Sequence, residues 1–293
     1  MRKLTCILLA LVLVTGFVFA GGGKDSGAQP ASQPASQSAA AQPAPQAVSI
    51  AVGGSTSVNP LMELLTAEYI KSHSHVKFNI SATGSGDGIK GVPAGTCEIG
   101  MSSRELTPAE IGTGIDELVI AIDGIAVVVN KSSPIASLTQ AQIKDIYTGD
   151  IGRWEQLGAA ANGKTGAIAV VSREAGSGTR GAFEELLKFQ DKMVARAIIF
   201  DSTGAIKAEV SRNADAIGYL SLGSLDDSIK ALNVENVEAS TANVLNSSYK
   251  IARPFLLMTK KGVPLNPETK AFLDWVMGAN GQNIVKTSWI SVN

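Results

Sequence analysis

One stretch of the chain limits the possible folds more than any other: an apolar run that leads through a turn rich in glycine and hydroxyl groups into a helical pattern. It spans residues 167–189, where Ala-Ile-Ala-Val-Val is followed by Ser-Arg-Glu-Ala-Gly-Ser-Gly-Thr-Arg-Gly. The apolar, partly β-branched run indicates a buried strand, and the clustered glycines indicate a tight turn. Free N–H groups and the dipole at a helix start favour a bound anion. The stretch therefore predicts an anion site, with a capped turn beside two surface arginines as the alternative.

Polar side chains in this turn supply further anion-binding groups. Arg173 and Arg180 flank the turn, and each guanidinium could donate two hydrogen bonds to a tetrahedral oxyanion. Ser177 and Thr179 add hydroxyl groups between them. These four residues are the first candidates for a binding site.

Three earlier segments of the chain repeat the same layout. In each, a short strand pattern is followed by a hydroxyl-rich loop and then a helix pattern; the loops are residues 53–57, 81–88 and 102–104. The helix after the third loop is signalled by Thr107, Pro108 and Glu110, which fit a capped first turn. In open α/β sheets, ligands bind at the carboxyl ends of the strands. Four such strand ends could therefore converge on one small anion.

The rest of the chain alternates strand and helix patterns, which predicts an α/β protein. Two long apolar runs are interrupted near their middle, one by Asp123-Gly124 and the other by Pro254. Each run can be a strand that leaves one domain and enters another. We therefore expect a discontinuous first lobe, residues 48–122 and 250–293, around an inserted second lobe, residues 123–249.

The N-terminal segment has the pattern of a secretory signal peptide in residues 1–20, with Arg2 and Lys3 before an apolar run too short to span a membrane. Cleavage after Ala20 predicts an exported or periplasmic protein. A lipoprotein signal would need a cysteine where Gly21 stands, so a lipid anchor is the less favoured alternative. Residues 21–47 are rich in Ala, Pro, Gln and Ser and predict a disordered linker. Such tethers are common behind lipid anchors, which keeps that alternative open.

Several other functions lack the residues that they require. The formal net charge is −1, so the sequence has no nucleic-acid footprint. His73 and His75 end the first predicted helix without other ligands nearby in sequence, so we expect neither a metal nor a cofactor. Neither histidine lies in a glycine- and serine-rich loop, which argues against a Ser–His nucleophile, and we expect no enzyme. Cys97 stands alone once Cys6 is cleaved off, so no intrachain disulfide is expected.

Six motifs, in this order, resemble the periplasmic phosphate-binding proteins of ABC-type phosphate importers, from about Val48 to Asn293. They are Gly-Ser-Thr-Ser-Val-Asn-Pro, Gly-Ser-Gly, Ile-Gly-Met-Ser-Ser-Arg-Glu-Leu, Asp-Gly-Ile-Ala-Val-Val-Val-Asn, Ile-Tyr-Thr-Gly-Asp-Ile-Gly-Arg-Trp and Ser-Arg-Glu-Ala-Gly-Ser-Gly-Thr-Arg. The resemblance implies a two-lobed α/β fold of the Venus-flytrap type, joined by two hinge-crossing segments and closing over inorganic phosphate. It also implies delivery to the membrane permease subunits of an importer, and we expect a monomer.

The resemblance further implies a set of phosphate ligands drawn from the four loops. They are Thr56 and Ser57, then Ser85, then Ser102 and Ser103, then Arg173, Ser177, Gly178 and Thr179, with Arg180 as an addition. Some relatives carry an acid in the third loop that accepts the proton of phosphate and rejects sulfate. Here Ser103 stands in that place, and we take Asp87 as the nearest carboxylate in the loops, with a helix-start residue as its alternative role. Sulfate or molybdate binding, phosphate-ester hydrolysis and a surface interaction protein remain the alternative functions.

Overall fold

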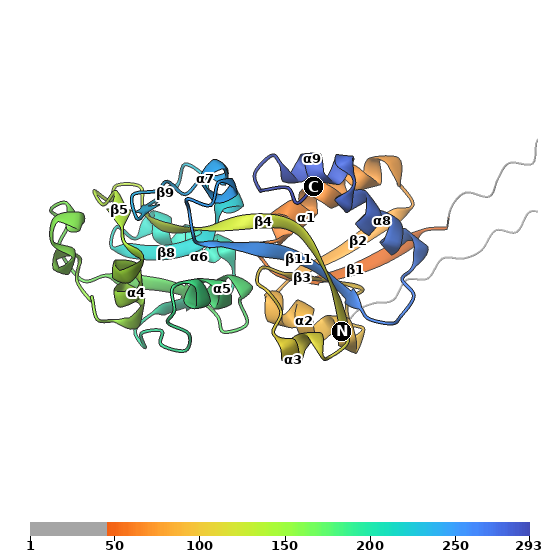
Figure 1. Cartoon of the computed structure of the whole chain (residues 1–293), viewed down its shortest axis with the longest axis horizontal. Coiled ribbons are helices and arrows are strands. Elements are labelled where there is room, and N and C mark those ends of the chain that lie inside the picture. The colour runs from red at the N-terminus through yellow and green to blue at the C-terminus, as the bar shows by residue number, and fades with distance from the viewer. Residues whose placement is uncertain (1–45) are drawn as a thin grey trace, which may run out of the picture. The chain divides into compact units, whose positions relative to one another are not determined.

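The computed structural model describes residues 46–293, which contain two lobes joined by two long strands (Figure 1). The predicted signal peptide and residues 21–45 of the predicted linker lie outside the described residues. Residues 45–293 form one compact unit of mixed α/β structure. Within the described residues, no helix combines the length and the apolar character that a membrane span needs.

The first lobe, called lobe 1, contains both chain segments that flank the insertion. Its strands are β1 (Val48–Gly54), β2 (Val76–Ala82) and β3 (Ile99–Ser102). Its helices are α1 (Asn59–Ser72), α2 (Ser85–Ala94), α3 (Pro108–Ile111), α8 (Pro267–Met277) and α9 (Ala279–Val285). Strand β1 pairs in parallel with β2 on one side and β3 on the other, so the carboxyl ends of these strands meet at one edge.

The second lobe, called lobe 2, is the insertion between the two long strands. Its strands are β5 (Ser137–Leu138), β6 (Ala169–Arg173), β7 (Ile198–Phe200), β8 (Ala216–Ser221), β9 (Ile229–Ala231) and β10 (Asn233–Val234). Its helices are α4 (Gln140–Thr148), η1 (Trp154–Ala161), α5 (Gly178–Leu186), α6 (Thr203–Arg212), η2 (Leu222–Ser224) and α7 (Thr241–Leu245), where η marks 3-10 helices. Strand β6 pairs in parallel with β7 and β8.

Two long strands, β4 (Ile115–Asn130) and β11 (Ala252–Lys260), run between the lobes and are called the crossing strands (Figure 1). Strand β4 pairs with β11 from Ile115 to Gly124, and from Ile125 onward it pairs with β8 of lobe 2. The change of partner falls at Gly124, where the Asp-Gly pair interrupts the apolar run. The predicted pair of crossing segments is therefore present.

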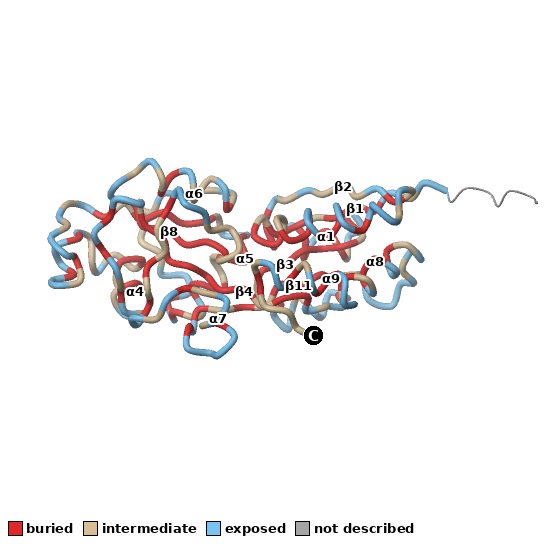
Figure 2. Tube along the Cα trace, turned by 90° about the horizontal axis from the view of Figure 1, so that it is seen from above, coloured by how far each residue is buried: buried red, intermediate tan, exposed pale blue. Residues whose placement is uncertain are grey.

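Each lobe has its own hydrophobic core (Figure 2). The lobe 1 core joins α1, α8 and α9 to the sheet through fully buried residues such as Leu61 and Phe272. The lobe 2 core includes Tyr147, Phe183 and Tyr219, whose rings stack or meet edge to face. Because apolar burial is the main favourable term in folding, each lobe has its own source of stability.

Candidate functional site

The first loop, between β1 and α1, points two hydroxyl groups at lobe 2. Ser55 acts locally, since its Oγ accepts hydrogen bonds from the N–H groups of Ser57 and Val58. The Oγ of Ser57 lies 2.7 Å from Thr179 Oγ1 and 2.9 Å from Thr203 Oγ1. The Oγ1 of Thr56 lies 3.2 Å from the same Thr203 oxygen. Both predicted residues of this loop are therefore placed between the lobes.

The second and third loops meet each other within lobe 1. The Oγ of Ser85, the first residue of α2, accepts a hydrogen bond from the Ser103 N–H at 3.1 Å and lies 3.3 Å from Ser103 Oγ. Ser103 Oγ also lies 3.5 Å from Thr179 Oγ1 in lobe 2. Ser102 differs, because its hydroxyl donates to the Arg104 carbonyl of its own loop at 2.9 Å. Of the predicted residues here, Ser85 and Ser103 are brought together and Ser102 is turned away.

The fourth loop approaches lobe 1 so closely that only glycine fits at position 178. A Cβ atom on Gly178 would lie 2.3 Å from Ser85 Oγ and 2.8 Å from Ser103 Oγ. Ser177 caps α5, its Oγ accepting from the Arg180 N–H at 3.3 Å, and Thr179 directs its hydroxyl at Ser57. The turn thus places a helix start of lobe 2 directly against the loops of lobe 1.

Arg173 ends β6 and is 2% exposed. Its Nε and one terminal nitrogen donate to the two carboxylate oxygens of Glu174, each at 2.9 Å. The other terminal nitrogen donates to Thr203 Oγ1 at 3.3 Å. Arg180 points elsewhere, with Nε bound to Glu184 at 2.6 Å and a terminal nitrogen donating to the Arg173 carbonyl at 3.0 Å. Arg173 therefore faces the site, while Arg180 supports the strand end behind it.

Five buried hydroxyl residues from five loops come together between the lobes, and we call them the hydroxyl cluster: Ser57, Ser85, Ser103, Thr179 and Thr203. Each is at most 6% exposed. Hydroxyl groups can donate or accept, so together with the N–H groups at the starts of α2, α5 and α6 the cluster can surround an anion with donors. The arrangement favours anion binding over any chemistry that needs a positioned base.

Thr203 is the member of the hydroxyl cluster that the sequence interpretation missed. It follows β7 in the segment Asp201-Ser-Thr-Gly204 and opens α6, with Ser202 as the helix cap. This is a fifth copy of the strand, hydroxyl-rich loop and helix layout. The signal was present in the sequence, but β7 has only three residues, and so short a strand gives a weak pattern.

Glu174 of the fourth loop places a carboxylate directly against Arg173, a predicted ligand. Asp87 is exposed in the first turn of α2, where the helix dipole favours a carboxylate. Glu174 instead forms a bidentate ion pair with Arg173. Residues 46–293 contain no group of three or more His, Cys, Asp or Glu side chains arranged to hold a metal ion.

Burial keeps a neighbouring phenol neutral. Loss of solvent at Tyr219 raises its pKa to about 12, against smaller opposing effects from hydrogen bonds with Ser172 and the Arg173 N–H. Its hydroxyl lies 2.8 Å from Ser172 Oγ and accepts from the Arg173 N–H at 3.3 Å. Tyr219 therefore fixes the end of β6, and with it the direction of Arg173, without adding charge.

A family model described as a PBP superfamily domain matches residues 34–280. The phosphate-binding protein PstS of Borreliella burgdorferi is 30% identical over 81% of this chain and 87% of that protein. A phosphate ABC transporter substrate-binding protein with bound phosphate from Clostridium perfringens is 43% identical, with a TM-score of 0.80 over 84% of this chain and 100% of that one. An ABC-type phosphate transport receptor from Vibrio cholerae is 33% identical, with a TM-score of 0.67 over 82% and 99% of the two chains.

Proposed function

Because the chain belongs to the PBP superfamily and, within it, to the family of the phosphate-binding protein PstS, we propose that it binds inorganic phosphate between its lobes. It then delivers the phosphate to an ABC-type importer. The observation that carries the proposal is the buried hydroxyl cluster beside Arg173, to which both lobes contribute. Its two-lobed fold is the one that the resemblance implies.

The proposed ligands are the hydroxyl groups that meet between the lobes and the helix starts beside them. They are Thr56, Ser57, Ser85, Ser103 and Thr179 with the Arg173 guanidinium, with Thr203 added, Ser177 at the cap of α5 and Gly178 contributing its backbone N–H group. Ser102 and Arg180 support the loops, because their polar atoms are bound within their own lobes. A buried dianion is costly unless hydrogen bonds saturate it, and this set offers many donors.

The charges around the site are balanced before an anion arrives. The guanidinium of Arg173 is paired with Glu174, and that of Arg180 with Glu184. Phosphate would therefore be held mainly by hydrogen bonds and helix-start N–H groups rather than by an excess of positive charge. Such a site can bind firmly in the closed state and still release its anion when the lobes separate.

Opening and closing would take place at the crossing strands. Hinge closure around a ligand is the established motion of two-lobed binding proteins, and a few residues at element ends absorb the change. We propose the lobe limits expected from the sequence, 48–122 with 250–293 and 123–249. The lobe 2 core reaches slightly beyond them, because Ile251 belongs to it.

Further parts of the proposal concern the cellular context. We propose export with cleavage of the signal peptide after Ala20, a monomeric protein, permease subunits as partners and no catalytic activity. The main competing function is binding of another oxyanion, because Ser103 brings no fixed negative charge to repel sulfate. Turnover of phosphate esters in an assay with an added divalent metal would instead support a hydrolase.

The proposed function can be tested by thermal unfolding and calorimetry of residues 21–293 with phosphate, sulfate, molybdate and arsenate. A ligand that binds only the native state stabilises it by RT ln(1 + [L]/Kd), about 4 kcal/mol at a thousandfold excess over Kd. We expect the largest stabilisation with phosphate or its close analogue arsenate. No stabilisation by phosphate would overturn the proposal, and a larger effect of sulfate or molybdate would move it to that oxyanion.

A further inference from the structure

A buried ion pair joins the two crossing strands at the point where β4 changes partner. Arg253 of β11 and Asp123 of β4 are opposite each other in the antiparallel register. A terminal nitrogen of Arg253 donates to Asp123 Oδ2 at 3.1 Å, and the two side chains are 2% and 0% exposed. The pair therefore lies inside the hinge rather than on its surface.

The same ion pair reaches into both lobes. In lobe 2, Ser221 at the end of β8 donates through Oγ to Asp123 Oδ1 at 2.8 Å. In lobe 1, the second terminal nitrogen of Arg253 donates to the Ser103 carbonyl at 2.7 Å. These three hydrogen bonds link Ser221, Asp123, Arg253 and Ser103 in one continuous chain, which we call the hinge bridge. One end of the hinge bridge is a residue of the hydroxyl cluster.

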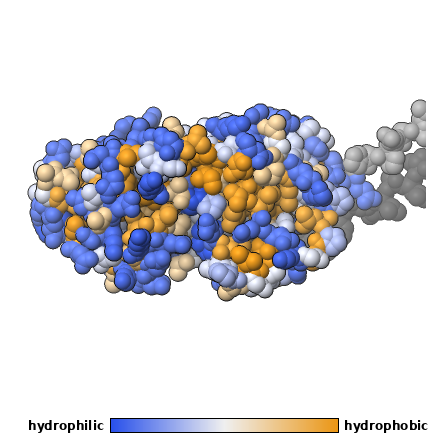
Figure 3. All heavy atoms as spheres, viewed as in Figure 1, coloured by the Kyte–Doolittle hydropathy of each residue, from blue (hydrophilic) through white to orange (hydrophobic). Residues whose placement is uncertain are grey.

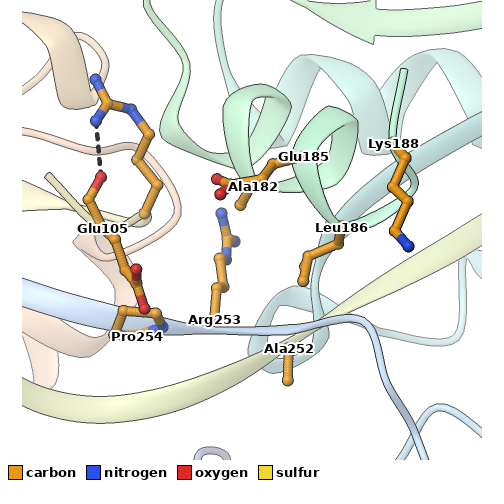
Figure 4. A pocket seen from close by; sticks show the side chains of 9 residues that line it. Glu105, Ala182, Glu185, Leu186, Lys188, Ala252, Arg253 and Pro254 are labelled. Carbon is orange, nitrogen blue, oxygen red and sulfur yellow. Dashed lines mark hydrogen bonds between the residues drawn. The ribbon is translucent and has the colours of Figure 1, made fainter. Parts of the chain in front are cut away.

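The surroundings of Arg253 place it at the border between the lobes. Figure 4 shows it in the wall of a cavity of about 290 Å³, between α5 of lobe 2 and the segment that carries Glu105 in lobe 1. Its guanidinium lies 5.3 Å from the centre of the Phe255 ring, which helps to fix its plane. Its orientation thus depends on both lobes and on β11.

Stability alone does not account for this ion pair. Taking two charges out of water costs free energy that their attraction recovers only in part, so a well-packed apolar pair is often at least as stable. Burial is also the main cause that raises the pKa of Asp123 and lowers that of Arg253. A conformational role in the hinge explains why charges occupy this position.

We propose that Arg253 is a positioning residue that holds the Ser103 loop in its anion-binding conformation and couples that loop to the hinge. Ser103 is held at three points, by its N–H on Ser85, its carbonyl on Arg253 and its hydroxyl near Thr179. Loss of the carbonyl contact frees the loop on the hinge side. The inference rests on the proposed phosphate site and deepens it, by naming what orients one of its ligands.

The competing explanation is that Arg253 attracts phosphate through its charge alone. The two explanations differ for Arg253→Lys, which keeps the charge that Asp123 needs. Lysine has one ammonium group in place of the planar fork, so it cannot reproduce both contacts with the geometry of arginine. They also differ in a Ser103→Ala background, where a positioning effect has no hydroxyl left to orient but a charge effect persists.

The experiment is a double-mutant cycle on phosphate Kd, measured by calorimetry with wild type, Arg253→Lys, Ser103→Ala and the double variant. We expect each single variant to raise Kd at least about tenfold, and the double variant to bind within about threefold of Ser103→Ala, because contacting residues are not additive. Lys230→Gln is the matched control, since its Nζ also donates to a carbonyl, that of Ser133, away from the cluster. We expect it to leave Kd unchanged.

Two results would overturn the inference. One is a phosphate Kd of Arg253→Lys within threefold of wild type, and the other is a double variant whose increase in Kd equals the product of the two single increases. If Arg253→Lys does not fold, the Asp123→Asn/Arg253→Gln variant removes both charges and enters the cycle in its place, with the same expectations. A wild type that does not bind phosphate would instead overturn the proposed function. The two failures are therefore distinguishable.

Discussion

Arg173 reaches the hydroxyl cluster with one terminal nitrogen, because the rest of its guanidinium already binds Glu174 and the Asp201 carbonyl. Arg173 therefore contributes a directed hydrogen bond as well as its charge. Arg180 shares the same turn but binds Glu184 and a strand-end carbonyl. Two arginines that look equivalent in the sequence thus have different roles.

Replacing Arg173 by alanine should weaken phosphate binding strongly. The change removes a buried donor and leaves Glu174 without its partner, which typically costs about 2–5 kcal/mol, or roughly 30- to several thousand-fold in Kd. Calorimetry on Arg173→Ala and Arg180→Ala would check this, with the smaller effect expected for Arg180→Ala. If Arg173→Ala binds within about threefold of wild type, Arg173 is not a ligand.

Thr203 offers a test of the ligand that the structure adds. Thr203→Val keeps the shape of the side chain and removes the hydroxyl that lies near Thr56, Ser57 and Arg173. Loss of one such hydrogen bond costs about 1 kcal/mol or more when its partners stay buried, so phosphate Kd should rise roughly tenfold. Thr287→Val, on an exposed helix end, should leave Kd unchanged. Equal affinities for both variants would remove Thr203 from the site.

Selectivity should depend on Glu174 rather than on Asp87. Phosphate near neutral pH carries a proton that it can donate and sulfate carries none, so an acceptor that repels sulfate separates them. A carboxylate has about four acceptor positions, so Glu174 can accept another bond beside those from Arg173. We expect Glu174→Gln to lower the preference for phosphate about tenfold, and Asp87→Asn to leave it unchanged. The ratio of sulfate Kd to phosphate Kd measures both, and the opposite pattern would refute this assignment.

Among the elements, the helices that follow three of the five loops of the site, α3, α5 and α6, begin with a side-chain cap. Ser177 caps α5 and Ser202 caps α6. The third loop leads to α3, where Thr107 and Glu110 form the capping box that the sequence predicts. Arg104 extends this cap, donating to both oxygens of Glu110 at 2.8 and 2.7 Å. Three of the loops of the site are thus anchored by capped helix starts.

The cap of α3 should make the free energy of unfolding decrease at acidic pH. Hydrogen bonds from Arg104, the largest cause, lower the pKa of Glu110 from 4.5 to about 2. A folded-state pKa below the unfolded value stabilises the native state fully above pH 4.5, and this stabilisation is lost as the pH falls toward 2. Glu110→Gln should therefore show a shallower loss of stability between pH 4.5 and 2, measured by urea unfolding. Glu117→Gln, on an exposed part of β4, should retain the slope of wild type.

In the whole molecule, two lobes with separate hydrophobic cores are joined by the two crossing strands. The candidate site depends on closure of the two lobes. Besides the hydroxyl contacts, the Gly86 N–H donates to the Gly176 carbonyl at 2.9 Å across the lobes. Figure 3 shows hydrophobic residues gathered on one face of lobe 1, and Val119 of β4 is among the exposed apolar residues. The binding site is thus a property of both lobes together.

Residues 21–45 should be dispensable for phosphate binding. Every proposed ligand and every residue of the hinge bridge lies in the compact unit of residues 45–293. A protein that starts at Gln46 should bind phosphate with the Kd of one that starts at Gly21, as measured by calorimetry. A loss of affinity greater than about threefold would show that the N-terminal segment takes part in binding.

Local patterns in the sequence were enough to predict four of the five loops of the site. Strand, hydroxyl-rich turn and helix are local patterns, so residues 53–57 and 173–180 could be assigned from composition and spacing. The change of partner at Gly124 in β4 could be inferred for the same reason, since a long apolar run with a break has few local interpretations.

Which polar groups face one another depends on contacts between segments that are distant in the sequence. Arg253 and Ser103 are 150 residues apart, and Ser57 and Thr203 are 146 apart. No local pattern records such pairs, because they depend on how two lobes close about the crossing strands. Ser102 and Arg180 are instead held by contacts within their own lobes, whereas Thr203 meets Thr56 and Ser57 of the other lobe. Local chemistry therefore placed the loops, and the packing of distant segments selected the side chains that meet.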